Sequence, residues 1–104
     1  MGQELGAVYQ KLFVVANEFL KLTQTMSITD LQKKNPTVED TARIAIILAS
    51  VMDELSEDNH ADNRVSLNGL QAALHMKQIA IAIRNNDEEA LDLAVKQLES
   101  ISFI

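Results

Sequence analysis

The side chains that could do chemistry in this sequence are few. There are two histidines and no cysteine, which excludes a cysteine nucleophile, a thiolate zinc site and a disulfide framework. Glu57 and His60 have the Glu-x-x-His spacing of a carboxylate-bridged di-iron ligand pair, but that site needs a second such pair and two further inward carboxylates. We find no such inward glutamates, so we expect His60 to be a solvated loop residue. His75 lies between core positions, and we expect it to be partly buried and satisfied by a neighbour.

Other motifs that carry chemistry are absent from the sequence. The stretch 58–69 has alternating acids like a calcium loop, but it lacks the glycine at the sixth position and the glutamate at the twelfth. There is no Gly-rich phosphate loop, Walker lysine, nucleophile elbow or His-Glu-x-x-His pair. We therefore expect a protein that is not an enzyme, with no catalytic residue, no cofactor and no metal.

Carboxylates are the most distinctive charged feature, and they gather in two stretches. The first comprises Asp53, Glu54, Glu57, Asp58 and Asp62, and the second comprises Asp87, Glu88, Glu89 and Asp92. If the helices pack antiparallel in sequence order, the two clusters lie at opposite ends of the bundle. Solvated helix ends explain both clusters simply, and the second also suits a positive helix N-terminus. The sharper hypothesis is that the first cluster docks a partner protein with a basic surface.

The charge of the whole chain limits which classes of partner it can bind. Its formal net charge is −6, whereas nucleic-acid contacts need clustered Lys and Arg. Lys33, Lys34 and Arg43 form only a weak basic spot, so we expect nucleic acid to be an unlikely partner. The longest apolar run, 44–49, is too short to span a bilayer. Without a signal peptide or cysteines, we expect a soluble, cytoplasmic protein that does not bind membrane.

Helices must position these side chains. Hydrophobic residues make up 47% of the 104 residues and aromatics only 4%, with three glycines and one proline. This composition favours close helix packing and predicts one domain covering 1–104. We expect an all-α, antiparallel bundle of four main helices at about 3–26, 37–57, 64–84 and 87–101, with a possible short extra helix at 27–34.

Local signals set the expected helix boundaries. Thr37 after Pro36 is a plausible N-cap, and Asn85-Asn86 suits a left-handed helix end followed by a new N-cap. The apolar run 79–83 also fits a buried strand by its periodicity; we assign it to the third helix because good helix formers lead into it. The predicted core side of that helix comprises Leu67, Leu70, Leu74, Met76, Ile79, Ala80 and Ile83.

The predicted helices carry more apolar surface than the core of a monomeric four-helix bundle would bury. The second helix is apolar on two sides, whereas the fourth offers only the narrow stripe Leu91, Ala94, Leu98 and Ile101. Since monomers rarely expose large apolar patches, we expect a homodimer. The predicted self-association residues are Phe13, Ile44, Leu48, Val51, Phe103 and Ile104. In the competing arrangement, segment 27–35 and the C-terminal tail fold back over this surface within one chain.

These expectations point to a small, acidic, non-enzymatic protein that acts through its helical surface. An adaptor, an inhibitor or an immunity-like regulatory factor would have these properties. The alternatives are a nucleic-acid-associated regulator and a bundle that binds a small ligand in its core.

Overall fold

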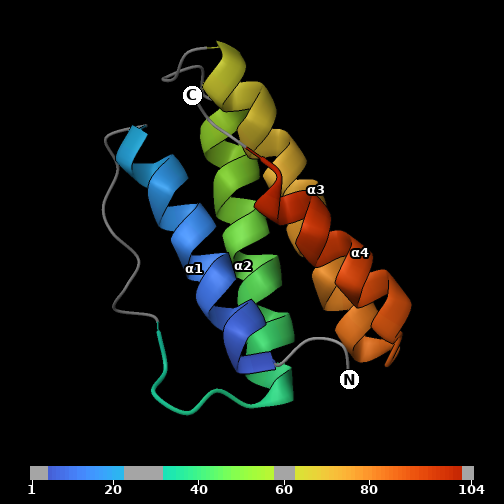
Figure 1. Cartoon of the computed structure of the whole chain (residues 1–104). Coiled ribbons are helices and arrows are strands. Elements are labelled where there is room, and N and C mark those ends of the chain that lie inside the picture. Colours follow the sequence, from blue (N-terminus) through green and yellow to red (C-terminus); the bar gives the residue numbers. More distant parts are fainter. Residues whose placement is uncertain (1–4, 23–31, 58–62, 102–104) are drawn as a thin grey trace.

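The computed structural model describes residues 5–22, 32–57 and 63–101, and it is built from four helices (Figure 1). They are α1 (Leu5–Leu22), α2 (Val38–Glu57), α3 (Asn63–Arg84) and α4 (Glu88–Glu99), and the described residues contain no strand. The all-α four-helix bundle is confirmed, and the ambiguous run 79–83 is helical. The possible short helix at 27–34 lies largely outside the described residues, and residues 32–34 are not helical.

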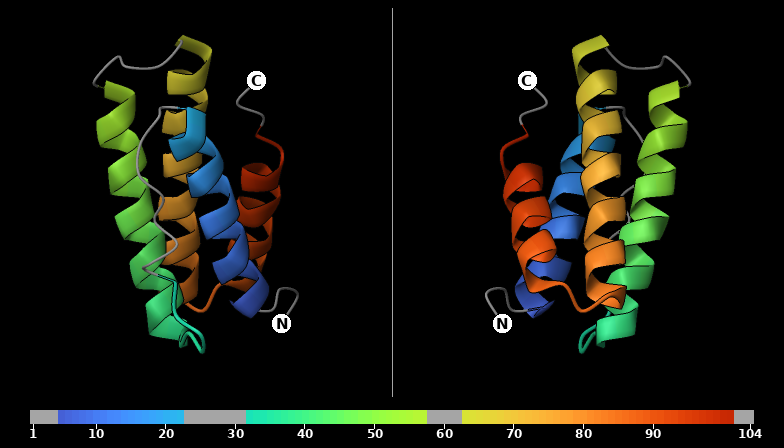
Figure 2. Two further views of the ribbon diagram at one scale, coloured as in Figure 1. Left: turned by 90° about the vertical axis from the view of Figure 1, so that its left-hand side faces the viewer. Right: turned by 90° about the vertical axis from the view of Figure 1, so that its right-hand side faces the viewer.

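The direction of α1 departs from a fully antiparallel bundle. Leu5, Val38 and Glu88, which begin α1, α2 and α4, line one hollow together with Ile83 near the end of α3. These three helices therefore run in the same direction, and α3 runs antiparallel to all of them (Figures 1 and 2). Connection 23–37 makes this possible, since fifteen residues can span roughly 50 Å and α1, with 18 residues, is about 27 Å long.

A reciprocal cap fixes the start of α2. The backbone N–H of Asp40 donates to Thr37 Oγ1 (3.1 Å), and the N–H of Thr37 donates to Asp40 Oδ2 (2.9 Å). Two donors that the first helical turn leaves unpaired are thereby satisfied. The prediction of Thr37 as the N-cap is confirmed.

The turn between α3 and α4 is also determined by residues that are close together in the sequence. Asn86 has a φ of 53°, and the N–H of Asp87 donates to the carbonyl of Ala82 (2.9 Å) while that of Asn86 donates to Ile83 (3.1 Å). This is the Schellman arrangement, which asparagine tolerates better than most residues. Asp87, and not an asparagine as predicted, then caps α4 by accepting from the N–H of Ala90 (3.1 Å).

The core is formed by one side of each helix, and α3 contributes mainly small side chains to it. Ala72, Ala73 and Ala80 are fully buried. At the start of α3, an added Cβ on Gly69 would lie 2.4 Å from Cε1 of Phe19 and 2.6 Å from Oγ of Ser56. A glycine is needed there because α1, α2 and α3 meet more closely than any side chain allows.

The structure corrects the predicted core side of α3. Leu67, Leu70 and Leu74 are exposed by 61%, 37% and 52%, whereas Met76, Ile79 and Ala80 are buried as expected. The buried line follows glycine and alanine because small residues permit close helix approach. The large leucines are consequently turned outward. On α4 the predicted stripe is confirmed, with Leu91, Ala94 and Leu98 buried and Ile101 packed against the core.

Candidate interaction surfaces

The first acidic cluster is only partly available to a partner. Asp53 forms an ion pair with Lys77 of α3 (2.7 Å), so its charge is offset within the chain. Glu54 and Glu57 are exposed and form no ion pair with a described residue. Asp58 and Asp62 lie outside the described residues. Two of the five predicted docking carboxylates therefore remain as an exposed, uncompensated pair at the end of α2.

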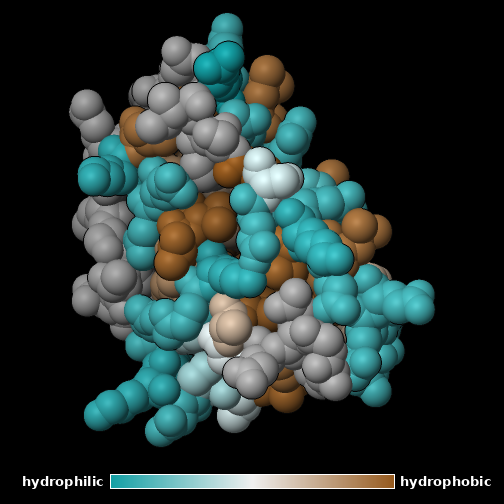
Figure 3. Space-filling view, in the orientation of Figure 1, coloured by the Kyte–Doolittle hydropathy of each residue, from teal (hydrophilic) through white to brown (hydrophobic). Residues whose placement is uncertain are grey.

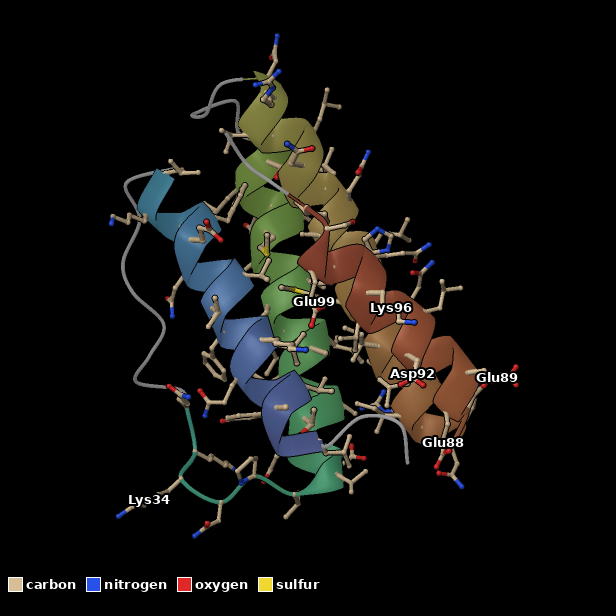
Figure 4. All side chains as sticks on the ribbon, viewed as in Figure 1. Lys34, Glu88, Glu89, Asp92, Lys96 and Glu99 are labelled. Carbon is tan, nitrogen blue, oxygen red and sulfur yellow. The ribbon has the colours of Figure 1, made fainter. Side chains whose placement is uncertain are left out.

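The second cluster lies at the opposite end of the bundle, where α4 begins. Figure 4 shows Glu88, Glu89 and Asp92 along the first turns of α4. Glu88 and Glu89 occupy the first turn, where carboxylates interact favourably with the helix dipole. One oxygen of Asp92 is buried without a hydrogen-bond partner among the described residues. Farther along, Glu99 forms an ion pair with Lys11 of α1.

Asp40 is the carboxylate whose environment changes its acidity most clearly. The Nζ of Lys33 donates to Asp40 Oδ1 (2.8 Å), and the N–H of Thr37 donates to its other oxygen. The lysine hydrogen bond is the largest cause that lowers the pKa of Asp40 from 3.8 to about 2, followed by the Thr37 backbone bond. Both contacts favour the charged form, which indicates a structural carboxylate that stays ionised.

The basic spot predicted near the start of α2 is largely compensated. Lys33 and Arg43 line a shallow hollow that also contains Tyr9, but the ammonium of Lys33 is paired with Asp40. The backbone N–H of Lys33 donates to the hydroxyl of Tyr9, which ties this segment to α1. Lys34 points away from the bundle (Figure 4). The arrangement joins α1 to α2 and does not gather positive charge on one surface.

A second surface, which the sequence patterns did not reveal, covers the outward side of α3. We define the outer α3 face as Leu67, Leu70, Leu74 and Ile81, together with Ile46 of α2 and Leu93 of α4. All six are exposed, with Ile81 at 59% and Leu93 at 58%. Ile81 and Leu93 line one shallow groove between α3 and α4. The signal available in the sequence was the seven-residue spacing of Leu67, Leu74 and Ile81.

The position of Ile46 follows from two ion pairs between α2 and α3. Asp53 pairs with Lys77, and Glu39 pairs with Arg84 (3.3 Å). Ile46 lies seven residues from each of those two carboxylates and thus on the same stripe of α2. It therefore lies beside the stretch of α3 between the two basic residues, which carries Ile81.

The side of the bundle formed by α1 and α4 is more hydrophilic. In Figure 3, hydrophilic side chains cover most of what α1 and α4 present to the viewer, and hydrophobic side chains are visible between the two helices. The outward side of α3 lies behind α4 in this view and is largely turned away (Figures 1 and 3).

Three of the six residues predicted for self-association are buried within the chain. Phe13, Ile44 and Leu48 are buried at 2%, 8% and 0% exposure in the core of the chain itself, and Val51 is half-buried. Phe103 and Ile104 lie outside the described residues. Phe13 packs against the ring of Tyr9, with centroids 5.0 Å apart. The first three residues are therefore inaccessible to a second copy, and any dimer must use other residues.

His75 has a polar neighbour but belongs to no cluster of metal ligands among the described residues. Nδ1 of His75 lies 3.0 Å from Oε1 of Gln78, which confirms the predicted neighbour, and His60 lies outside the described residues. Within the described ranges, no three His, Asp or Glu side chains come close enough to hold a metal ion. None of the four helices is both long and apolar enough to cross a membrane.

Comparison with known proteins gives no further guide to this chain. No family model, no curated protein and no solved structure matches it.

Proposed function

We propose that this chain is a small, acidic, non-enzymatic interaction protein that binds a basic partner through the end of α2. Adaptors, inhibitors and immunity-like factors act in this way. The observation that carries the proposal is the exposed carboxylate pair Glu54 and Glu57, which has no counter-charge among the described residues, unlike Asp53. Asp58 and Asp62 follow directly in the sequence and add to the negative charge of this region.

The distribution of ion pairs supports this choice of surface. Glu39, Asp40 and Glu99 each form an ion pair within the chain, and the carboxylate of Asp87 caps α4. Those groups have structural partners, and a basic protein would have to compete with them. The pair at the end of α2 has no such partner among the described residues, so its field is available to steer a basic protein during association.

The two alternative functions receive less support from the described residues. A nucleic-acid-binding regulator needs clustered positive charge, but Lys33, Lys77 and Arg84 all form ion pairs with carboxylates of the chain. A ligand-binding bundle needs a cavity of roughly 300–1,000 Å³. The apolar hollow at the end of the bundle, which Leu5, Val38 and Leu91 help to line, has a volume of about 80 Å³. The groove between α3 and α4 is larger, at about 320 Å³, but it is open to the surface and does not lie in the core.

The experiment compares a charge reversal at the end of α2 with one elsewhere on the surface. The wild-type chain is used to capture partners from its native host, and the association rate of each captured protein is measured at several salt concentrations. The double variant Glu54→Lys/Glu57→Lys should slow association at least about tenfold and remove most of its salt dependence. The control is Glu18→Lys, an exposed carboxylate on α1, which should have a small effect. Equal rates for the wild type and the double variant would overturn the proposal.

A further inference from the structure

The outer α3 face is a second surface, separate from the end of α2, and its spacing is symmetric about one residue. Leu67, Leu74 and Ile81 recur every seven residues on the outward side of α3, as in a coiled-coil seam. Leu74 lies midway between the other two. An antiparallel pairing of α3 with an identical helix would place Leu74 against its own copy and Leu67 against Ile81 of the other chain. A two-fold contact requires this kind of self-complementarity.

Charge also favours a second copy on this face. Each chain carries a net charge of −6, so two copies repel one another wherever their carboxylates are uncompensated. The α3 sequence contains no Asp or Glu, and its Lys77 and Arg84 neutralise Asp53 and Glu39 at the edge beside α2. The α3 stripe itself therefore brings no carboxylate into a contact between two acidic chains.

The edge beside α4 is also nearly uncharged. The groove there is lined by the amides Gln78, Asn85 and Gln97 and by Ala90, with Asp87 at its end engaged as the cap of α4. Amides can form hydrogen bonds across an interface without the desolvation cost of charged groups.

The exposed area is consistent with a symmetric interface of modest stability. The six apolar residues of the outer α3 face expose between 36% and 61% of their surface, and the largest apolar patch on a typical monomer is roughly 300–600 Å². A standard interface buries about 800 Å² per partner, with an apolar centre and a polar rim. The apolar residues would supply the centre, and Gln71, Lys77 and Gln78 around them, all exposed, would supply the rim.

We propose that the outer α3 face is the interface of a two-fold homodimer, with α3 packed antiparallel against α3 of the second copy around Leu74. This inference does not depend on the proposed function, because the dimer uses α3 and leaves Glu54 and Glu57 outside the paired apolar stripe. A dimer would present two copies of the acidic end of α2 to partners.

Sedimentation equilibrium over the micromolar range tests the proposal. The wild type should approach twice the chain mass of 11.5 kDa as its concentration rises. Leu74→Arg places two positive charges together at the symmetry axis and should raise the dissociation constant at least about 30-fold. Ile81→Arg is a second variant at an exposed position, and it should weaken the dimer as well. Circular dichroism and thermal unfolding confirm that each variant is folded.

The matched control is Val14→Arg on α1, because Val14 is as exposed as the α3 residues, at 62%, but lies on another helix. It should leave the dimer intact. A wild-type mass near 11.5 kDa throughout the range would overturn the proposal. A dimer that survives both α3 substitutions but dissociates with Val14→Arg would also overturn it. If the wild type is monomeric and Leu74→Arg abolishes binding to a different protein, the face serves that protein and not a second copy.

Discussion

Gly69 is the position where a single methyl group should most affect stability. It lies within α3, where alanine is favoured over glycine by about 1 kcal/mol because it loses less backbone entropy. Local helix propensity alone therefore predicts that Gly69→Ala stabilises the protein. The structure predicts the opposite, since the new Cβ would lie 2.4 Å from a ring carbon of Phe19 and 2.6 Å from Oγ of Ser56.

The size of the effect follows from how little either neighbour can move. Phe19 is 0% exposed and Ser56 is 3% exposed, so relief of the overlap requires α3 to move away from α1 and α2. Overpacking of a well-packed core costs about 1–3 kcal/mol. Two overlaps on one methyl group place Gly69→Ala near the upper end of that range. After the gain in helix propensity, we expect a net destabilisation of about 2 kcal/mol, or a Tm lower by roughly 8–12 °C.

Thermal and urea unfolding of matched variants measure this effect. Gly6→Ala is the control, because Gly6 is helical with nothing within 4 Å of the new Cβ, and its stability should be unchanged or slightly higher. Phe19→Leu reduces the side chain that the methyl group meets, so the cost of Gly69→Ala should be smaller in that background. A Gly69→Ala protein at least as stable as the wild type would refute the close contact of α1, α2 and α3.

Two further predictions concern polar groups. Because the folded-state pKa of Asp40 is about 2 and its ordinary value is 3.8, Asp40 contributes stability above pH 3.8 that is lost as the pH falls toward 2. Asp40→Asn should therefore reduce the difference between urea midpoints measured at pH 5 and pH 2, and an unchanged difference would contradict the assigned contacts. Ser56→Ala removes a buried hydroxyl without a hydrogen-bond partner among the described residues; it should leave the unfolding free energy unchanged or raise it by up to about 1 kcal/mol, and a clear loss in urea unfolding would mean that the hydroxyl is satisfied.

The helix ends could be predicted from the sequence because their causes are local. Thr37 and Asp40 are three residues apart and cap one another, and Asn86 adopts the left-handed conformation that ends α3. The apolar stripe of α4 could also be predicted, since its large apolar residues lie along one narrow line and only that side of the helix can be buried. The two helix ends depend on residues within about one to two helical turns of one another, and the stripe depends on residues of α4 alone.

The orientation of α3 could not be predicted in the same way. Leucines at 67, 70 and 74 favour burial by hydrophobicity, but glycine and alanine on the other side permit closer packing and determine which side is buried. The direction of α1 relative to α2 depends on connection 23–37, which carries no local signal for its course. The neutralisation of Asp53 by Lys77 joins residues 24 positions apart, so spacing within the acidic cluster gave no indication of it.

The central claim, that α3 presents a self-complementary outer face, is tested most directly by NMR of the wild-type chain over a dilution series. The account predicts concentration-dependent shifts of the methyl groups of Leu67, Leu74 and Ile81, with Val14 as the unaffected reference. Such shifts would place the contact on the outward side of α3. Shifts confined to α1, or spectra that do not change with concentration while the protein stays monomeric, would contradict the claim.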